Sequence, residues 1–315
     1  MNKRYILFLF IILTISCHRV KDKIDPNVSY CVEESYLTSL STSFPSLSYD
    51  EKRQTWAKEY QIAEAFAQSL DFYRAISTYM RAKILIPSEN MERKLQIEYS
   101  IVLCYYLSKK YEDAVESFEK SELFQVEKTF PAYKDLLLIL YDSYNKIGEE
   151  KKSRQILNAI DQKYPTMKKK LSLSTALQKG HIKEALHLSQ DMNSKNEIQQ
   201  MIFSYSEEKK SVGGAQILNA LIPGTGYLYV GQKKSALTSF LLNSLFIAAS
   251  YQFFHKGYTA AGIICVSFEA GWYFSGIYGA GEEAKFFNEQ LYEQKAAPLM
   301  QKEKLFPIFM VEYTF

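Results

Sequence analysis

Two long stretches without charge near the end of the chain constrain its fold most. Residues 236–254 read ALTSFLLNSLFIAASYQFF and hold no charged residue, and residues 258–281 are again apolar, interrupted only by Glu269. Each stretch is long enough to cross the ~30 Å hydrocarbon core of a bilayer as a helix. The intervening His255-Lys256-Gly257 suits a tight hairpin. The sequence therefore predicts two neighbouring membrane spans. A buried helical pair in a soluble domain is the alternative, although little surrounding chain is left to cover it.

A broken apolar segment precedes the first span. Residues 218–231 read LNALIPGTGYLYVG, in which Pro223, Gly224 and Gly226 interrupt any helix. Broken backbone at membrane depth is tolerated where neighbouring helices cover it, and glycine lets two backbones approach closely. We therefore expect a half-helix or re-entrant turn here, within a membrane helical domain over 212–288.

Glu269 is the one ionisable group inside the predicted spans, and such a group is costly in a bilayer unless it is paired. Counting outward from the connection at 255–257 places Asn243 and Glu269 at similar depth, each on the polar face of its helix. We expect a hydrogen bond between them, with the carboxyl group protonated. A proton-relay or transport role for Glu269 is the alternative.

The first residues have the form of a targeting segment. MNKRYILFLFIILTISC gives a basic start, an apolar run and a small residue before Cys17. This pattern resembles a bacterial lipoprotein box, which implies a signal peptide over 1–17 and lipidation of Cys17; Thr14 departs from the leucine usual there. An uncleaved anchor or an ordinary signal peptide is the alternative. Residues 18–51, rich in serine and threonine, are expected to form a tether.

A helical pattern begins near residue 52 and repeats. Small and aromatic residues at Phe66, Ala75 and Tyr79 are followed by Pro87. After a shift of 39 the pattern recurs at Tyr105, Ala114 and Phe118, where the terminal proline is missing, and a further copy extends to Pro165. These offsets resemble the tetratricopeptide repeat, although the spacing exceeds the 34 residues of that family. The resemblance implies a helical solenoid over 52–207 and a protein-binding scaffold without chemistry of its own.

The family's groove positions can be carried onto this sequence as a predicted peptide-binding surface. They fall on seven residues: Tyr60, Glu64, Tyr99, Leu103, Tyr106, Leu138 and Asp142. Aromatic rings beside carboxylates suit an extended or helical peptide. The alternative is that Tyr99 and Tyr106 simply pack inside an atypical solenoid.

The pattern PGTGYLYVG, followed by Asn243 and later by SGIYGAGEEAKFFN, resembles a bacterial membrane domain of the form PGxGQxYxG. That domain accompanies tetratricopeptide segments and the YidD-type membrane protein insertion factor, so the resemblance implies envelope biogenesis by association. Tyr227 stands where glutamine is usual, and the cysteine-rich insertion-factor module is missing. The predicted membrane motif comprises Pro223, Gly224, Gly226, Tyr229, Gly231, Asn243 and Glu269.

Composition and motifs argue against several other classes of protein. The 315 residues carry a net charge of only +3 without a basic stripe, so no nucleic-acid partner is expected. The four cysteines form no CxxC pattern and the histidines no cluster, so neither a metal nor a cofactor is expected. No GxSxG, P-loop or HExxH motif is present, so we expect a non-enzymatic adaptor that binds a protein or peptide. The alternative is a small-molecule or ion pathway formed by an oligomer of the hairpin.

The expected fold class is therefore all-α, a tetratricopeptide-like solenoid followed by a membrane-embedded helical hairpin with a broken or re-entrant helix. Lys233 and Lys234 favour a cytoplasmic start for the first span, whereas Lys209 and Lys210 argue the other way. We favour an inner-membrane protein with periplasmic repeats; an outer-membrane lipoprotein is the alternative. Alternation at the end of LFPIFMVEYTF predicts a short strand within a tail over 289–315.

Overall fold

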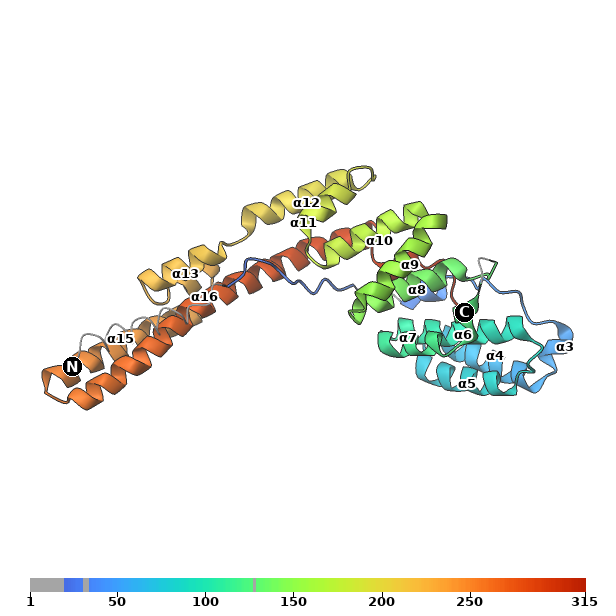
Figure 1. Ribbon diagram of the computed structural model, residues 1–315, viewed down its shortest axis with the longest axis horizontal. Coiled ribbons are helices and arrows are strands. Elements are labelled where there is room, and N and C mark those ends of the chain that lie inside the picture. Colours follow the sequence, from blue (N-terminus) through green and yellow to red (C-terminus); the bar gives the residue numbers. More distant parts are fainter. Residues whose placement is uncertain (1–19, 31–33, 127–128) are drawn as a thin grey trace. The chain divides into compact units, whose positions relative to one another are not determined.

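The computed structural model describes residues 20–30, 34–126 and 129–315, and every regular element in them is helical (Figure 1). This confirms the expected all-α class. The chain divides into two compact units. The first, which we call the hairpin unit, comprises Met1–Ser29 and Leu177–Leu299, and the second, the repeat unit, comprises Tyr30–Ala176 and Met300–Phe315.

The repeat unit is built from consecutive helices that pack in pairs, α4 on α5, α6 on α7 and α8 on α9. Their bounds are α4 Thr55–Gln68, α5 Phe72–Leu85, α6 Met91–Leu107, α7 Tyr111–Glu119, α8 Tyr133–Lys146 and α9 Glu150–Lys163. Shorter helices are α2 Glu34–Thr38, α3 Tyr49–Lys52, η1 Glu122–Gln125 and η2 Pro307–Met310, while α10, Pro165–Gln178, runs across the boundary between the units.

The same turn joins the two helices of each pair. Leu70, Lys109 and Gly148 follow α4, α6 and α8, and all three have a positive φ, of 60°, 59° and 80°. The next residue in each case donates its backbone N–H to the carbonyl four residues before that position, at 2.9 Å, which makes three Schellman caps. The turns lie 39 residues apart, the spacing that the sequence pattern predicts.

Small residues allow the first pair to pack closely. Ala63, Ala67, Ala75 and Ala82 on α4 and α5 are completely buried. The ring of Tyr79 fills the space above them, with its centroid 5.7 Å from that of Tyr60. Alanine presents little side-chain volume, so the two helix backbones approach and the tyrosine ring supplies the buried area.

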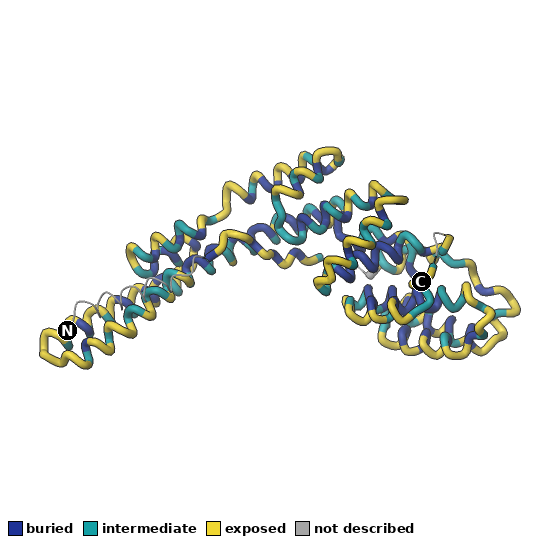
Figure 2. The backbone as a smooth tube through the Cα atoms, in the orientation of Figure 1, coloured by how far each residue is buried: buried dark blue, intermediate teal, exposed yellow. Residues whose placement is uncertain are grey.

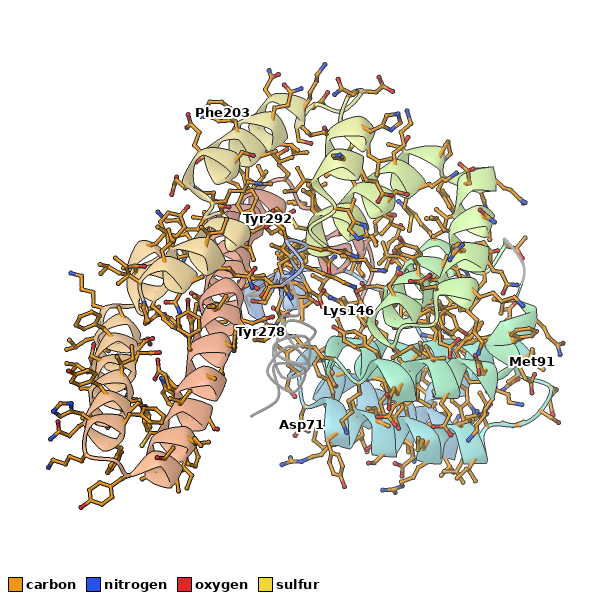
Figure 3. The ribbon with its side chains drawn as sticks, turned by 60° about the vertical axis from the view of Figure 1, so that its left-hand side comes forward. Asp71, Met91, Lys146, Phe203, Tyr278 and Tyr292 are labelled. Atoms are coloured by element: carbon orange, nitrogen blue, oxygen red, sulfur yellow. The ribbon has the colours of Figure 1, made fainter. Side chains whose placement is uncertain are left out.

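The hairpin unit contains two short helical pairs and two long helices. Their bounds are α11 Ile182–Leu188, α12 Lys195–Glu208, α13 Val212–Leu221, α14 Thr225–Val230, α15 Lys233–His255 and α16 Thr259–Lys302. α15 and α16 lie side by side in both ribbon views (Figures 1 and 3). A Cβ on Gly276 of α16 would lie 3.8 Å from the Ser239 hydroxyl of α15, consistent with direct packing.

The predicted tail requires two corrections. α16 continues to Lys302, well past residue 288, because EEAKFFNEQLYEQKAA is rich in strong helix formers and buries Tyr292, Ala296 and Met300. The predicted strand is wrong, since the described residues 303–315 form only η2 and irregular chain. The backbone of this segment binds the Asp135 side chain of the repeat unit rather than pairing with a sheet.

The described residues 20–30 and 34–51 are also more ordered than a tether. Val20, Ile24 and Val28 are buried within the hairpin unit, and Val20 joins a core with Val212 and Ala284. The backbone N–H groups of Asp25 and Asn27 donate to the side chains of Glu289 and Glu293 at 2.8 and 2.6 Å. An apolar residue at every fourth position lets this extended segment lie along α16.

Candidate functional site

The structure buries six of the seven predicted groove residues. The buried side chains are Tyr60, Tyr99, Leu103, Tyr106, Leu138 and Asp142, while Glu64 is half-buried. They therefore do not line an open groove, and the expectation of an accessible surface at these positions is corrected. The packing alternative for Tyr99 and Tyr106 is the one the structure shows.

The polar groups among these residues bind one another. The Tyr106 hydroxyl donates to Asp142 at 2.9 Å, and the Gln96 amide donates to the Tyr60 hydroxyl at 2.6 Å. Tyr60 donates in turn to Glu64 at 3.2 Å. Burial raises the pKa of Asp142, which the hydrogen bond from Tyr106 partly offsets.

Two segments of the same chain cover this face of the repeat unit. Phe44, before α3, packs on Tyr99 with ring centroids 5.6 Å apart. The backbone N–H of Tyr313, in the tail, donates to the buried Asp135 carboxylate of α8 at 2.9 Å. Burial raises the pKa of Asp135 to about 6, although the tail amides act in the opposite direction.

Arg93, at the start of α6, binds the first of these segments, residues 45–51. We call this set of contacts the Arg93 clamp. Its guanidinium makes two hydrogen bonds to the Glu51 carboxylate, at 2.7 and 3.1 Å, and also donates to the carbonyls of Pro45 and Ser46. The hydrogen bonds from Arg93 lower the pKa of Glu51 to about 2. A planar guanidinium with five donors suits such a junction better than lysine would.

A groove remains open on another part of the repeat unit, between η1, α8 and α9. It has a volume of about 520 Å³. Its apolar wall comprises Phe118, Leu123, Phe124, Val126, Leu136, Leu137, Leu140, Ile156 and Ala159. Phe124 is 71% exposed, which is unusual for a phenylalanine with no covering element. We call this feature the α8–α9 groove.

A second opening lies beside the Arg93 clamp, with a volume of about 790 Å³. Met91, which projects from the start of α6 (Figure 3), and the carboxylate-bearing residues Glu51, Glu89 and Glu92 are among its lining residues. Its lining is more polar than that of the α8–α9 groove.

In the hairpin unit, α15 and α16 are long and apolar enough to cross a membrane. Only 17% and 6% of their most apolar stretches are buried within the chain, as the exposed tube over these helices shows (Figure 2). The exposed side chains include Leu237, Phe240, Leu241, Leu245, Ile247, Tyr251, Ile263, Ile264, Val266 and Phe268. A helical pair in a soluble core would bury these faces, so the structure does not support that alternative.

The helix breaks at Pro223-Gly224, as the sequence predicts. Gly224 has a φ of +95°, and its N–H donates to the buried Asn219 side chain at 2.8 Å. A Cβ on Gly224 would overlap the carbonyl oxygen of Ala236, and one on Gly226 would overlap that of Ala215. The break therefore depends on glycine in two ways, through a positive φ and through close backbone approach.

The remaining residues of the predicted membrane motif hold the helix ends. Gly231 ends α14 with a φ of +92°. The Tyr229 hydroxyl accepts the N–H of Ser211 at 3.1 Å, and its ring lies 5.1 Å from the Lys210 ammonium. Asn288 donates to and accepts from the Lys210 backbone, at 2.8 and 2.7 Å.

The predicted hydrogen bond between Asn243 and Glu269 is not formed. The Asn243 amide donates to the Ser239 carbonyl at 2.6 Å, while Asn243 Oδ1 and Glu269 Oε2 have no hydrogen-bond partner among the described residues. Gly276 faces Ser239 and Gly262 faces the Phe254 ring. This register sets Glu269 roughly one helical turn away from the level of Asn243.

Sequence reasoning missed several residues that organise these sites. Asn288 ends the stretch SGIYGAGEEAKFFN, which resembles the PGxGQxYxG domain, and Asn219 lies just before the stretch PGTGYLYVG, so this proximity to the motif was the available signal. Arg93 and Asp135 look like ordinary helix-surface charges, and nothing local in the sequence marks the segments that they bind.

Among the described residues no group of three histidine, cysteine or carboxylate side chains could hold a metal ion. Cys104 is buried and Cys265 half-buried, both as free thiols. The predicted lipidation site, Cys17, lies outside the described residues.

In comparisons with known proteins, no family model, no curated protein and no solved structure matches this chain. The resemblances to the lipoprotein box, the tetratricopeptide repeat and the PGxGQxYxG domain therefore rest on the residues that carry them.

Proposed function

We propose that this chain is a non-enzymatic, membrane-anchored scaffold whose repeat unit binds a protein or peptide partner. The observation that carries the proposal is the contrast between its two units. The repeat unit buries most of its large apolar residues, whereas the hairpin exposes apolar side chains along two helices of spanning length. Insertion into a bilayer would bury those side chains in hydrocarbon and remove them from water.

The repeated helical pairs support the scaffold part of the proposal. Three pairs joined by the same cap, 39 residues apart, fit a tetratricopeptide-like solenoid with lengthened turns. Such solenoids commonly present extended surfaces to partners. We assign the partner to the exposed α8–α9 groove rather than to the buried face around Tyr106.

The break around Pro223 supports a segment that enters the bilayer without crossing it. α13 and α14 expose Ile217, Leu221 and Leu228, although neither helix is long enough to span. We propose an inner-membrane protein with periplasmic repeats, lipidated at Cys17 and serving cell-envelope biogenesis or membrane-protein assembly. An outer-membrane lipoprotein is the alternative location.

Site-specific photocrosslinking in cells tests the binding function. A photoreactive residue at Phe124, in the α8–α9 groove, should give one discrete protein adduct. The matched control is the same probe at Phe203, which is 63% exposed on α12 and lies outside that groove. Equal, diffuse or absent adducts from the two positions would contradict the proposal.

A pathway for ions or small molecules through an oligomer of the hairpin is the second candidate. Four buried side-chain oxygens favour it, because they have no hydrogen-bond partner in the described part of the chain: Ser239 Oγ, Asn243 Oδ1, Ser250 Oγ and Glu269 Oε2. Polar groups at membrane depth require partners, which a second hairpin or a transported ion would supply. If Glu269→Gln leaves ion flux through reconstituted vesicles unchanged, this candidate loses its one ionisable residue.

A further inference from the structure

Residues 311–315 of the tail bind to the repeat unit in the manner of an extended peptide. We call the site that holds them the slot, which lies between Asp135 of α8 on one side and residues 40–41 on the other. On one side, the N–H groups of Glu312 and Tyr313 donate to Asp135, at 3.2 and 2.9 Å. On the other side, the N–H of Thr314 donates to the Ser41 carbonyl at 3.0 Å, and its hydroxyl donates to the Leu40 carbonyl at 3.0 Å. The three consecutive backbone N–H groups of residues 312–314 therefore all donate to acceptors of the repeat unit. Any extended segment carries such donors and could make the same hydrogen bonds.

The buried Asp135 carboxylate in the slot requires hydrogen-bond donors from the segment that binds there. Asp135 is only 1% exposed, and its described hydrogen bonds all come from the tail amides. A carboxylate that loses its donors while buried carries a large desolvation cost. When residues 311–315 leave, another segment with adjacent free N–H groups would restore the same bonds.

The tail does not fill the slot. A cavity of about 350 Å³ remains beside Phe315, with walls that include Leu37, Leu40, Ala67 and Leu70. Phe315 itself is half-buried, with its ring centroid 6.3 Å from that of Phe72. The Glu312 side chain pairs with Lys134 at the outer edge and remains 50% exposed. A larger apolar side chain than the one present would fit at the end of the slot.

We propose that this slot is a binding site for an extended segment of a partner protein, occupied in the isolated chain by residues 311–315, which the partner displaces. The segment it fits has two adjacent free backbone N–H groups, then a small hydroxyl residue, then an aromatic residue. The inference rests on the proposed scaffold function, because it assigns that function a second contact besides the α8–α9 groove.

A synthetic peptide of residues 309–315, FMVEYTF, tests the proposal by fluorescence anisotropy with the full chain and with a chain ending at residue 310, both in detergent. The shortened chain should bind the peptide at least about tenfold more tightly, because its own tail no longer competes. The matched control is the same peptide N-methylated at Tyr313, which lacks one donor to Asp135 and should bind roughly tenfold more weakly. Both peptides partition similarly into micelles, so their difference reports the slot.

A full-length Tyr313→Pro variant provides a second reading, since proline removes the same N–H while most of the tail remains. It should melt cooperatively and bind the free peptide more tightly than the parent chain does. Equal binding by the parent and shortened chains, indifference to N-methylation, or unfolding of both variants would overturn the proposal. Unfolding would mean that the tail is an obligatory part of the core.

Further outcomes distinguish this proposal from binding at the α8–α9 groove and from binding of a second copy of the chain. Peptide binding without any adduct from Phe124 would support the slot and contradict the assignment of a partner to the α8–α9 groove. Adducts from Phe124 without peptide binding would support the groove and contradict the slot. A full-length dimer that the free peptide dissociates would show that a second copy occupies the slot, which overturns its assignment to a different protein.

Discussion

The Tyr106 hydroxyl donates a hydrogen bond of 2.9 Å to Asp142, and both side chains are almost completely buried inside the repeat unit. The two residues lie one helical repeat apart, on α6 and α8, so the bond joins neighbouring pairs. Their role in this structure is to join two neighbouring helical pairs, and neither side chain is accessible from the surface.

Replacing Tyr106 with phenylalanine should destabilise the repeat unit by about 1–3 kcal/mol, because Asp142 would remain buried without its donor. The pKa of Asp142 is already raised by burial, and losing the donor raises it further. A raised carboxylate pKa in the folded state means that protonation favours folding. The destabilisation should therefore be larger at about pH 7 than at about pH 5, as urea melts at both values would show. Equal destabilisation at the two values would contradict this assignment.

Glu51→Gln should weaken the clamp that holds residues 45–51 against α6, lowering stability by about 2 kcal/mol at neutral pH. The pKa of Glu51 is depressed in the folded chain, from its ordinary 4.5 to about 2, chiefly by hydrogen bonds from Arg93. Its contribution is therefore complete above about pH 4.5 and disappears as the pH falls toward 2. The control is Glu150→Gln, since the Glu150–Arg154 pair is mostly exposed and should contribute under about 0.5 kcal/mol. Equal losses from both variants in thermal melts would rule out a special role for the clamp.

Gly226→Ala should disrupt the hairpin unit, because the added methyl group would overlap the Ala215 carbonyl and the side chain of Ala280. We expect a loss of about 2–3 kcal/mol, seen as a lower melting temperature in detergent. Gly213→Ala is the matched control, since a Cβ there meets nothing within 4 Å and alanine favours the helix. A Gly226→Ala protein as stable as the control would show that α14 does not pack as described.

Features governed by local sequence were predictable. The uncharged stretches gave two long helices, the Pro223-Gly224 pair gave the break, and the repeat spacing recurs in the turns at Leu70, Lys109 and Gly148. Each depends on residues within one turn or one helix, where propensity and chain geometry decide the outcome.

Features governed by docking between distant segments were not predictable. The segment around Phe44 and the tail at Tyr313 have no helical period, and only the folded partner surfaces at Tyr99 and Asp135 determine where they lie. The Asn243–Glu269 bond failed for a related reason. Counting the same number of residues outward from the hairpin turn predicts facing residues only if the two helices are not shifted along their axes. Side-chain packing between the helices determines the register that is observed.

The proposed function of a membrane-anchored scaffold depends on α15 and α16 entering a bilayer. The most direct measurement is alkaline carbonate extraction of membranes from cells that produce the Cys17→Ala variant behind a signal peptide that is cleaved off, so that neither a lipid nor an uncleaved N-terminal segment can anchor the chain. We predict that the variant stays with the membrane pellet, because the exposed apolar faces of the hairpin remain in lipid. Release into the supernatant would contradict the membrane hairpin and leave the lipid as the only anchor.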